Sequence, residues 1–288
     1  MSDPTMSDPN PGDERGLYLY CFAEGADDVS LDCRGLGTGP VRTLARRNLV
    51  AVMQGCSTTP FSSNDREEVE GWLLAHQEVV DAGWRRFGTV LPCAFNTIVR
   101  ARDGRSPEEN VAVWLVENRA DVCAKLERLR GRAEYGVQIV WEPERISSQV
   151  VAEEPELARL EMEAEKQSGG IAYLSRERLK KRLRQALEER ADALYRGFYR
   201  RIRARVEAVQ VGRLHQETGG KAMLMNLSCL LPQGEEERLG SLLDEIDGIE
   251  GCSVRFTGPW PPYSFVGLVG SPDRDEAFPP PEPQQRAE

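Results

Sequence analysis

Short apolar runs along the first half of the chain predict four strands. Residues 17–22 are apolar at every position, which is typical of a central strand covered on both faces. Residues 48–54 and 135–142 predict two further strands. Residues 89–99 are also extended, but Pro92 lacks a backbone donor and restricts this segment to a sheet edge or a bulge.

Two helices are expected between these strands. Asn64 and Glu67 form a capping-box pattern, and Ser106, Pro107 and Glu109 supply an N-cap, a first-turn proline and a capping-box acid. The apolar stripe of the first helix consists of Val69, Trp72, Leu73, His76, Val79 and Val80. The second helix is expected to bury Val111, Leu115, Val122, Leu126 and Leu129. This order predicts a small α+β sandwich with helices over one face of a sheet.

A long helix dominates the second half of the chain. Its apolar stripe is Leu179, Leu183, Leu187, Leu194, Phe198, Ile202, Val206 and Val209. About 30 residues would extend roughly 45 Å, so the helix either spans two domains or packs against another long helix. A strand over 221–231 and a short helix over 239–246 follow it. Strands are then predicted over 252–257, with Cys252, Val254 and Phe256 inward, and over 263–269.

These elements predict a two-domain protein of the α+β class. A chain of 288 residues is longer than one ordinary core requires. The expected divisions are a disordered leader (1–15), an N-terminal domain (16–142), a C-terminal domain with an acidic connector (143–270) and a disordered proline-rich tail (271–288). The leader has neither the basic start nor the apolar core of a secretory signal.

Charge is distributed unevenly along the chain. The net charge of −10 disfavours a general affinity for nucleic acid or anionic membranes, and no stretch approaches the roughly 20 apolar residues of a membrane span. Residues 142–165 contain eight acids and two arginines, whereas residues 176–205 contain twelve basic residues and four acids. The basic charges surround the helix, and the acidic block can neutralise them. An ion network is therefore favoured over nucleic-acid binding.

The sequence contains few candidates for catalysis or metal binding. His76 lies on an apolar helix stripe, which indicates a core histidine. His215 lies in a loop near Glu217, but no set of nucleophile, base and orienting residue is complete there. The seven cysteines form no CxxC pair and are expected to be reduced core residues. The glycine-rich residues 34–40 lack phosphate-loop spacing and favour a flexible hairpin. We therefore expect no catalytic residue, cofactor or metal site.

The stretch TGPWPPYSF places a tryptophan among three prolines, one of whose peptide bonds could be cis. Because it is wedged between the last two predicted strands, a rigid crossover with Trp260 filling the core is favoured over a free polyproline ligand. This stretch resembles the closing signature of the gas vesicle protein F/L family (GvpF/GvpL). The signature residues are Gly258, Pro259, Trp260, Pro261, Pro262, Tyr263 and Phe265.

Three other segments support the resemblance, which covers residues 16–270 in order. LYLYCFAEG is similar to the opening strand of the family, and GGIAYLSRERLKKRL to the start of its long helix. HQEVV followed by TVLPCAFNT is similar to its His-x-x-Val and Val-Leu-Pro-x-Arg-Phe-Gly-Thr segments. Residues 94–97 depart from this pattern, because they are Ala-Phe-Asn-Thr instead of Arg-Phe-Gly-Thr.

The resemblance implies a non-enzymatic accessory protein of gas vesicle assembly, cytoplasmic and vesicle-associated, with a modified ferredoxin-like C-terminal domain. Implied partners are the hydrophobic shell protein GvpA and other Gvp proteins, for which the chain would be an adaptor, nucleation or chaperone-like factor. Matching surfaces would be the sheet edge at Pro92 or a crevice lined by the long helix. Candidate partner-facing residues are Pro92, Phe95, Tyr173, Arg176 and Arg200.

Two other function classes stay open at this point. One is a small-molecule enzyme or ligand binder on a ferredoxin-like scaffold, which would use His215, Glu217 and Tyr263. The other is a nucleic-acid-binding regulator that would use the arginine-rich helix.

Overall fold

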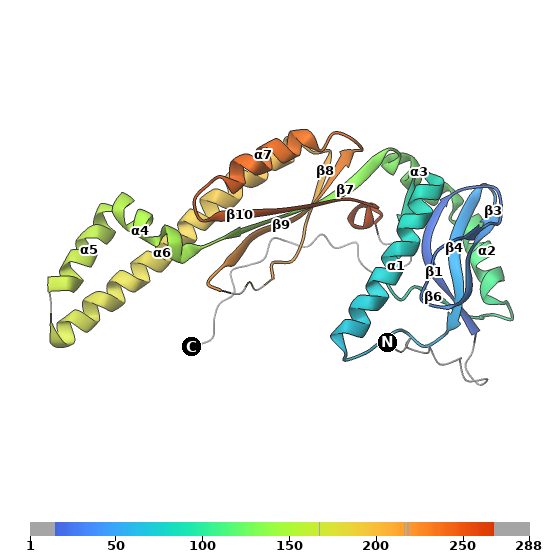
Figure 1. Ribbon diagram of the computed structural model, residues 1–288, viewed down its shortest axis with the longest axis horizontal. Helices are drawn as coiled ribbons and strands as arrows, with labels where there is room; N and C mark the ends of the chain where they lie inside the picture. Colours follow the sequence, from blue (N-terminus) through green and yellow to red (C-terminus); the bar gives the residue numbers. More distant parts are fainter. Residues whose placement is uncertain (1–14, 167, 216, 218, 268–288) are drawn as a thin grey trace, which may run out of the picture. The chain divides into compact units, whose positions relative to one another are not determined.

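The computed structural model describes residues 15–166, 168–215, 217 and 219–267 (Figure 1). It confirms the mixed helix and sheet class and contains two antiparallel sheets. Contacts divide the chain into a first unit, Met1–Glu127 with Tyr263–Glu288, and a second unit, Arg128–Pro262. The predicted leader, apart from Arg15, and the predicted tail lie outside the described residues.

The first unit is built around strand β1 (Arg15–Glu24), which is buried at every position between its two ends. The sheet order is β2-β3-β4-β1-β5, and β6 also pairs with β1. The other strands are β2 (Ser30–Leu31), β3 (Thr38–Arg46), β4 (Leu49–Ser57), β5 (Val90–Pro92) and β6 (Ile98–Val99). Strand β2 precedes the glycine-rich residues 34–40 and β3 begins within them, and β5 is an edge strand, as Pro92 predicts.

Helices cover both faces of this sheet, so the expectation of helices on one face is wrong (Figure 1). Helix α1 (Arg66–Phe87) packs on β1, and α2 (Pro107–Glu117) packs on β3 and β4. Because β1 is apolar at consecutive positions, it needs a cover on each side. Tyr18 and Tyr20 lie in the core under α1, whereas Phe22 stacks on Trp114 of α2 at 4.7 Å.

The helix starts follow local capping. Asp65, one residue after the predicted cap, accepts a hydrogen bond from the Glu67 amide at 2.9 Å. The capping box of α2 is confirmed, because the Ser106 amide donates to Glu109 Oε2 at 2.7 Å. The expected second helix is two helices, α2 and α3 (Arg119–Leu129). All five of its predicted core residues are buried, whereas Leu73 on the stripe of α1 is 46% exposed.

The second unit has a four-stranded sheet with the order β10-β7-β9-β8. Its strands are β7 (Arg132–Trp141), β8 (Ala208–Val211), β9 (Ala222–Pro232) and β10 (Cys252–Trp260). β7 pairs with β9 along its whole length, so the boundary between the units lies near residue 128 instead of residue 142. The sequence pattern predicts β7 as a strand but does not indicate which sheet it joins.

Helix α6 (Gly169–Arg203) is the predicted long helix and lies wholly in the second unit. Within the described residues of the second unit, α6 packs against shorter helices and not against another long helix. The expected acidic connector forms helices α4 (Pro143–Glu153) and α5 (Pro155–Lys166), which lie along α6 (Figure 1). α6 also contacts β9 and α7 (Glu237–Asp247), the short helix predicted over 239–246. The buried residues of α7 are Leu239, Leu242, Leu243 and Ile246.

The closing signature differs most from its prediction. Tyr263–Phe265 is a single 3-10 turn that belongs to the first unit, so no strand forms at the described positions of 263–269. Phe256 and Trp260 are 36% and 42% exposed, because β10 is an edge strand, and Trp260 does not fill the core. The Gly258–Pro259 peptide bond is cis.

Candidate interaction surfaces

An aromatic and polar cluster fills the core of the first unit beneath α1. The Tyr18 hydroxyl lies 3.0 Å from His76 Nδ1 and accepts a hydrogen bond from the Asn96 amide at 2.9 Å. Burial lowers the pKa of His76 to about 4, so the imidazole is neutral at pH 7. This confirms His76 as a core histidine.

Asn96 shows why the departure from the family pattern at residues 94–97 is tolerated. Its φ of 66° lies in the left-handed region, where glycine or asparagine is favoured. Its side chain also donates to the Phe61 carbonyl and accepts from the Phe61 amide, each at 2.9 Å. Ala94, which replaces the family's arginine, is exposed and lies outside the core.

The candidate partner-facing residues fall into two groups. Pro92 is buried, and Phe95 is half-buried with its ring 6.0 Å from that of His76, so both support the core of the first unit. Tyr173, Arg176 and Arg200 are exposed on α6. Their contact with a partner stays a prediction.

The residues proposed for an enzyme site are not assembled within either unit. Tyr263 packs against the core of the first unit, where burial raises the pKa of its hydroxyl well above the ordinary value. His215 and Glu217 lie in an exposed loop of the second unit. Within the described part of the chain, no three His, Cys, Asp or Glu side chains are placed to hold a metal ion.

The glycine-rich hairpin uses its backbone donors internally. The Leu36 amide donates to the Tyr20 hydroxyl and the Gly37 amide to Gln54 Oε1, each at 2.8 Å. A Cβ atom on Gly37 would lie 2.0 Å from the Gly55 carbonyl oxygen, so this position requires glycine. These two amides are therefore not free to cradle a phosphate group.

The predicted ion network forms between the acidic helices and α6. Arg182 Nη2 lies 2.6 Å from Glu154 Oε2, and its Nε lies 3.4 Å from Glu156 Oε2. Arg190 Nη1 lies 3.4 Å from Glu153 Oε2. These contacts hold α4 and α5 against α6 and neutralise part of its charge. Among the described residues, no helix is long and apolar enough to cross a membrane.

The end of the α5–α6 pair carries exposed apolar side chains, which we call the hairpin apex. They are Met162, Ile171, Tyr173 and Leu174, and their exposed fractions range from 52% to 65%. They lie on either side of the turn between the two helices, at the end of α6 away from the sheet (Figure 1). Exposed basic residues follow them on α6, starting with Arg176. The apex is therefore an apolar surface with basic residues beyond it on α6 and with exposed Glu161, Glu163 and Glu165 beside it on α5.

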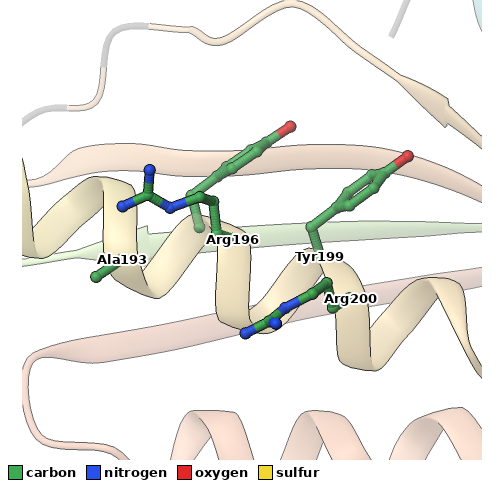
Figure 2. Close-up of a pocket in the computed structure, with 5 residues that line it drawn as sticks. Ala193, Arg196, Tyr199 and Arg200 are labelled. Atoms are coloured by element: carbon green, nitrogen blue, oxygen red, sulfur yellow. The ribbon is translucent and has the colours of Figure 1, made fainter.

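A second surface lies nearer the other end of α6, and we call it the Tyr–Arg face. The rings of Tyr195 and Tyr199 are 6.0 Å apart and inclined by only 9°. With Ala193, Arg196 and Arg200 they line an open hollow of about 450 Å³ (Figure 2). Burial, followed by the neighbouring Tyr199, raises the pKa of Tyr195 above its ordinary value. The four-residue spacing of these Tyr and Arg pairs is visible in the sequence, although the predictions missed it.

Comparison with known proteins agrees with the described fold and signature. A family model for the gas vesicle synthesis protein GvpL/GvpF matches residues 16–267. The chain belongs to this family. It is 33% identical over 248 residues to gas vesicle protein L of Haloferax mediterranei, covering 84% of this chain and 75% of that protein. It is 29% identical over 275 residues to gas vesicle protein L2 of Halobacterium salinarum, covering 91% and 95%.

A solved GvpF structure shares the fold of this GvpL/GvpF family member. The match to the crystal structure of GvpF from Anabaena sp. PCC7120 covers 88% of this chain and 99% of the GvpF chain, with a TM-score of 0.68. The sequence identity is 18%, so this likeness concerns the fold alone. The family resemblance drawn from the closing signature and the long helix is confirmed.

Proposed function

We propose that this protein is a non-enzymatic accessory factor of gas vesicle assembly that holds the hydrophobic shell protein GvpA and links it to other Gvp proteins. It acts as an adaptor, nucleation or chaperone-like factor in the cytoplasm and at the growing vesicle. Membership of the GvpL/GvpF family supports the assignment to gas vesicle synthesis. The exposed apolar side chains of the hairpin apex support a role in holding an apolar partner.

The exposed hairpin apex is the observation that carries this proposal. A wall that encloses gas and excludes water needs subunits with a large apolar face, and such subunits aggregate unless that face is covered. A factor that covers it must expose apolar side chains of its own. The apex exposes four large ones, and the basic residues that follow keep this surface soluble.

The first unit offers a matched comparison surface. Leu73 and Leu74 on α1 are 46% and 71% exposed, so they are about as accessible as the apex residues, but no Lys or Arg lies within one turn of them. Both are flanked by acidic Glu70 and Glu78 within one or two turns of the helix. Replacing Leu73 with Leu74, or Ile171 with Leu174 at the apex, changes a similar apolar area and leaves the buried core untouched.

The test is co-expression with the shell protein, followed by affinity purification of this chain from the soluble fraction. Ile171→Gln with Leu174→Gln should reduce the co-purified shell protein at least about tenfold, since each lost apolar contact is worth about 1–2 kcal/mol. Leu73→Gln with Leu74→Gln should leave the amount within about twofold. If the unaltered chain retains no soluble shell protein, the holding function is wrong. If the substitutions at Leu73 and Leu74, and not those at the apex, reduce the amount of co-purified shell protein, the assignment of shell-protein binding to the apex is wrong.

A further inference from the structure

The β10 edge of the sheet in the second unit is largely blocked. The Val254 amide, which points away from the neighbouring strand, donates to Asp247 Oδ1 at 2.7 Å. The Cys252 amide donates to the Ile249 carbonyl at 3.0 Å. Pro259, further along β10, has no amide hydrogen to donate. These features limit the addition of another strand at this edge.

The β8 edge on the other side of the sheet is open. Directly after β8, the Gly212 amide donates to the Asn226 carbonyl of β9 at 2.8 Å. Because backbone groups alternate in direction along a strand, the amides and carbonyls of Val209 and Val211 point away from β9. Within the described residues these groups have no hydrogen-bond partner. One more strand can therefore pair with β8.

The side chains at the β8 edge are apolar. Val209 and Val211 lie opposite Cys229 and Leu227, which are buried in the core of the second unit. The two valines therefore extend that core to the edge of the sheet, where Val211 is 55% exposed. A strand added at this edge would cover the exposed valine.

The flank of α6 nearest to β8 is aromatic. α7 packs on β10, whereas α6 contacts β9, so α6 is the helix nearer to β8. Arg201 pairs with Glu245 of α7, and position 199 lies about 200° from it around the helix axis. Tyr199 therefore projects from the side of α6 that faces away from α7 (Figure 2). The nearly parallel ring of Tyr195, one turn earlier, extends this surface.

Charges of opposite sign lie at the two ends of this aromatic surface. Asp192 precedes the tyrosines by three residues and Arg203 follows them by four, so these four residues form one stripe, which we call the tyrosine flank. Within the described residues, neither Asp192 nor Arg203 has an ion-pair partner. Two such flanks packed antiparallel would place Asp192 of each copy near Arg203 of the other. The pattern therefore fits a second copy of this chain related by a two-fold axis.

We propose that two copies of this chain form a dimer through β8 and the tyrosine flank of α6. The two β8 strands pair antiparallel with Gln210 on the two-fold axis. Val209 of each copy then exchanges two backbone hydrogen bonds with Val211 of the other. The two four-stranded sheets become one continuous sheet, and the exposed valines are covered.

The dimer carries two hairpin apices. They lie at opposite ends of the paired α6 helices, because the two helices run antiparallel. With the holding function proposed above, one dimer binds two shell subunits and gains avidity for an array of them. This consequence rests on the proposed function, whereas the dimer itself does not, and the experiments on the dimer need no shell protein.

Disulfide trapping in the full chain tests the position of the two-fold axis. Gln210→Cys places two thiols on opposed strands with Cβ atoms about 4.5–5.5 Å apart, close to the separation in a disulfide. Mild oxidation should convert most of this variant to a covalent dimer on non-reducing gels. Thr257→Cys, exposed on the β10 edge of the same sheet, should stay at the background set by the seven native cysteines. No trapping at position 210, or equal trapping at both positions, would overturn the proposal.

Analytical ultracentrifugation over about 1–100 µM chain measures the dimer without oxidation. The unaltered chain should sediment as a dimer at the upper end of this range. Val211→Lys should raise the dissociation constant of the dimer at least about tenfold, because it sets a charge against Val209 of the other copy. Thr257→Lys adds the same charge at the β10 edge and should leave the constant within about twofold. A chain that is monomeric at about 100 µM would contradict the dimer.

Exchanged charges test the contact between the α6 helices. Asp192→Arg alone or Arg203→Asp alone should weaken the dimer about threefold to tenfold, because each sets like charges against each other at two symmetric positions. The two substitutions together should return the dissociation constant to within about twofold of the original, and circular dichroism checks that each variant is folded. A double variant no tighter than the single variants would show that the helices do not pack antiparallel through this flank.

Discussion

The tyrosines of β1 and those of α6 are used in opposite ways. Tyr18 and Tyr20 are fully buried, and both hydroxyls take part in hydrogen bonds with distant parts of the first unit. Tyr173 is 65% exposed, and Tyr199 lines an open hollow. The same residue type therefore fills the core of one unit and lies at the surface of the other. The comparison predicts that substitutions in β1 alter stability, whereas substitutions on α6 alter binding.

The largest expected effect is on the buried ring of Tyr18. Tyr18→Ala should lower the free energy of unfolding by about 3–5 kcal/mol, because it leaves a cavity and removes a hydroxyl that contacts His76 and the Asn96 amide. Chemical denaturation monitored by circular dichroism measures this change. Tyr173→Ala is the matched control and should change stability by less than about 0.5 kcal/mol. Equal effects at the two positions would contradict the comparison.

The second expected effect concerns pH and His76. Its pKa is lowered to about 4 in the folded chain by burial, against about 6.5 in the unfolded chain. The unfolded state therefore binds more protons between these values, so stability is intact above pH 6.5 and falls as the pH drops toward 4. The loss should reach roughly 2–3 kcal/mol in unfolding experiments at stepped pH. A His76→Gln chain should show a shallower slope over this window, and an identical slope would exclude His76 as the cause.

Local elements could be predicted from the sequence, whereas the pairing of strands that lie far apart in the chain could not, and the reason is physical. Consecutive apolar residues in β1 identify a buried strand, and the capping box at Ser106 identifies a helix start, because both signals are local. The sheet that β7 joins depends on pairing with β9, which lies about 90 residues further along the chain. The exposure of Trp260 likewise follows from the edge position of β10, which no local pattern reveals.

The candidate surfaces were predicted only in part. The long basic helix and its pairing with the acidic block were visible as opposite charges in neighbouring segments, and Arg182 confirms that pairing. Pro92 and Phe95 were assigned to a partner surface because extended edge segments are often accessible. They instead lie against the core, because α1 covers that edge of the sheet.

A third effect is expected from the backbone at Asn96. Asn96→Val should cost about 2–4 kcal/mol, since a β-branched residue is strained at a φ of 66° and both hydrogen bonds to Phe61 are lost. Asn96→Gly loses the same hydrogen bonds without the strain and should cost only about 1–2 kcal/mol. Thermal unfolding of the two variants measures the difference. If valine proves no worse than glycine, the left-handed conformation does not explain the choice of residue.

The smallest expected effect is on the ion network of α6. Glu154→Gln should weaken the attachment of α4 and α5 by about 0.5–1 kcal/mol, because Arg182 keeps a second acidic partner in Glu156. Hydrogen exchange of the α4 and α5 amides should quicken, while the amides of β1 remain unchanged. A double-mutant cycle with Arg182→Gln measures the coupling. A coupling energy of zero would mean that apolar packing alone holds these helices.

The most direct test of the account measures shell-protein binding and unfolding on the same proteins. Ile171→Gln with Leu174→Gln should reduce the amount of shell protein held in solution at least about tenfold while the unfolding midpoint stays within about 2 °C of the unaltered chain. That result would separate the contact surface of α6 from the stability of the fold. Full retention of the shell protein by this doubly substituted, normally folded chain would contradict the account.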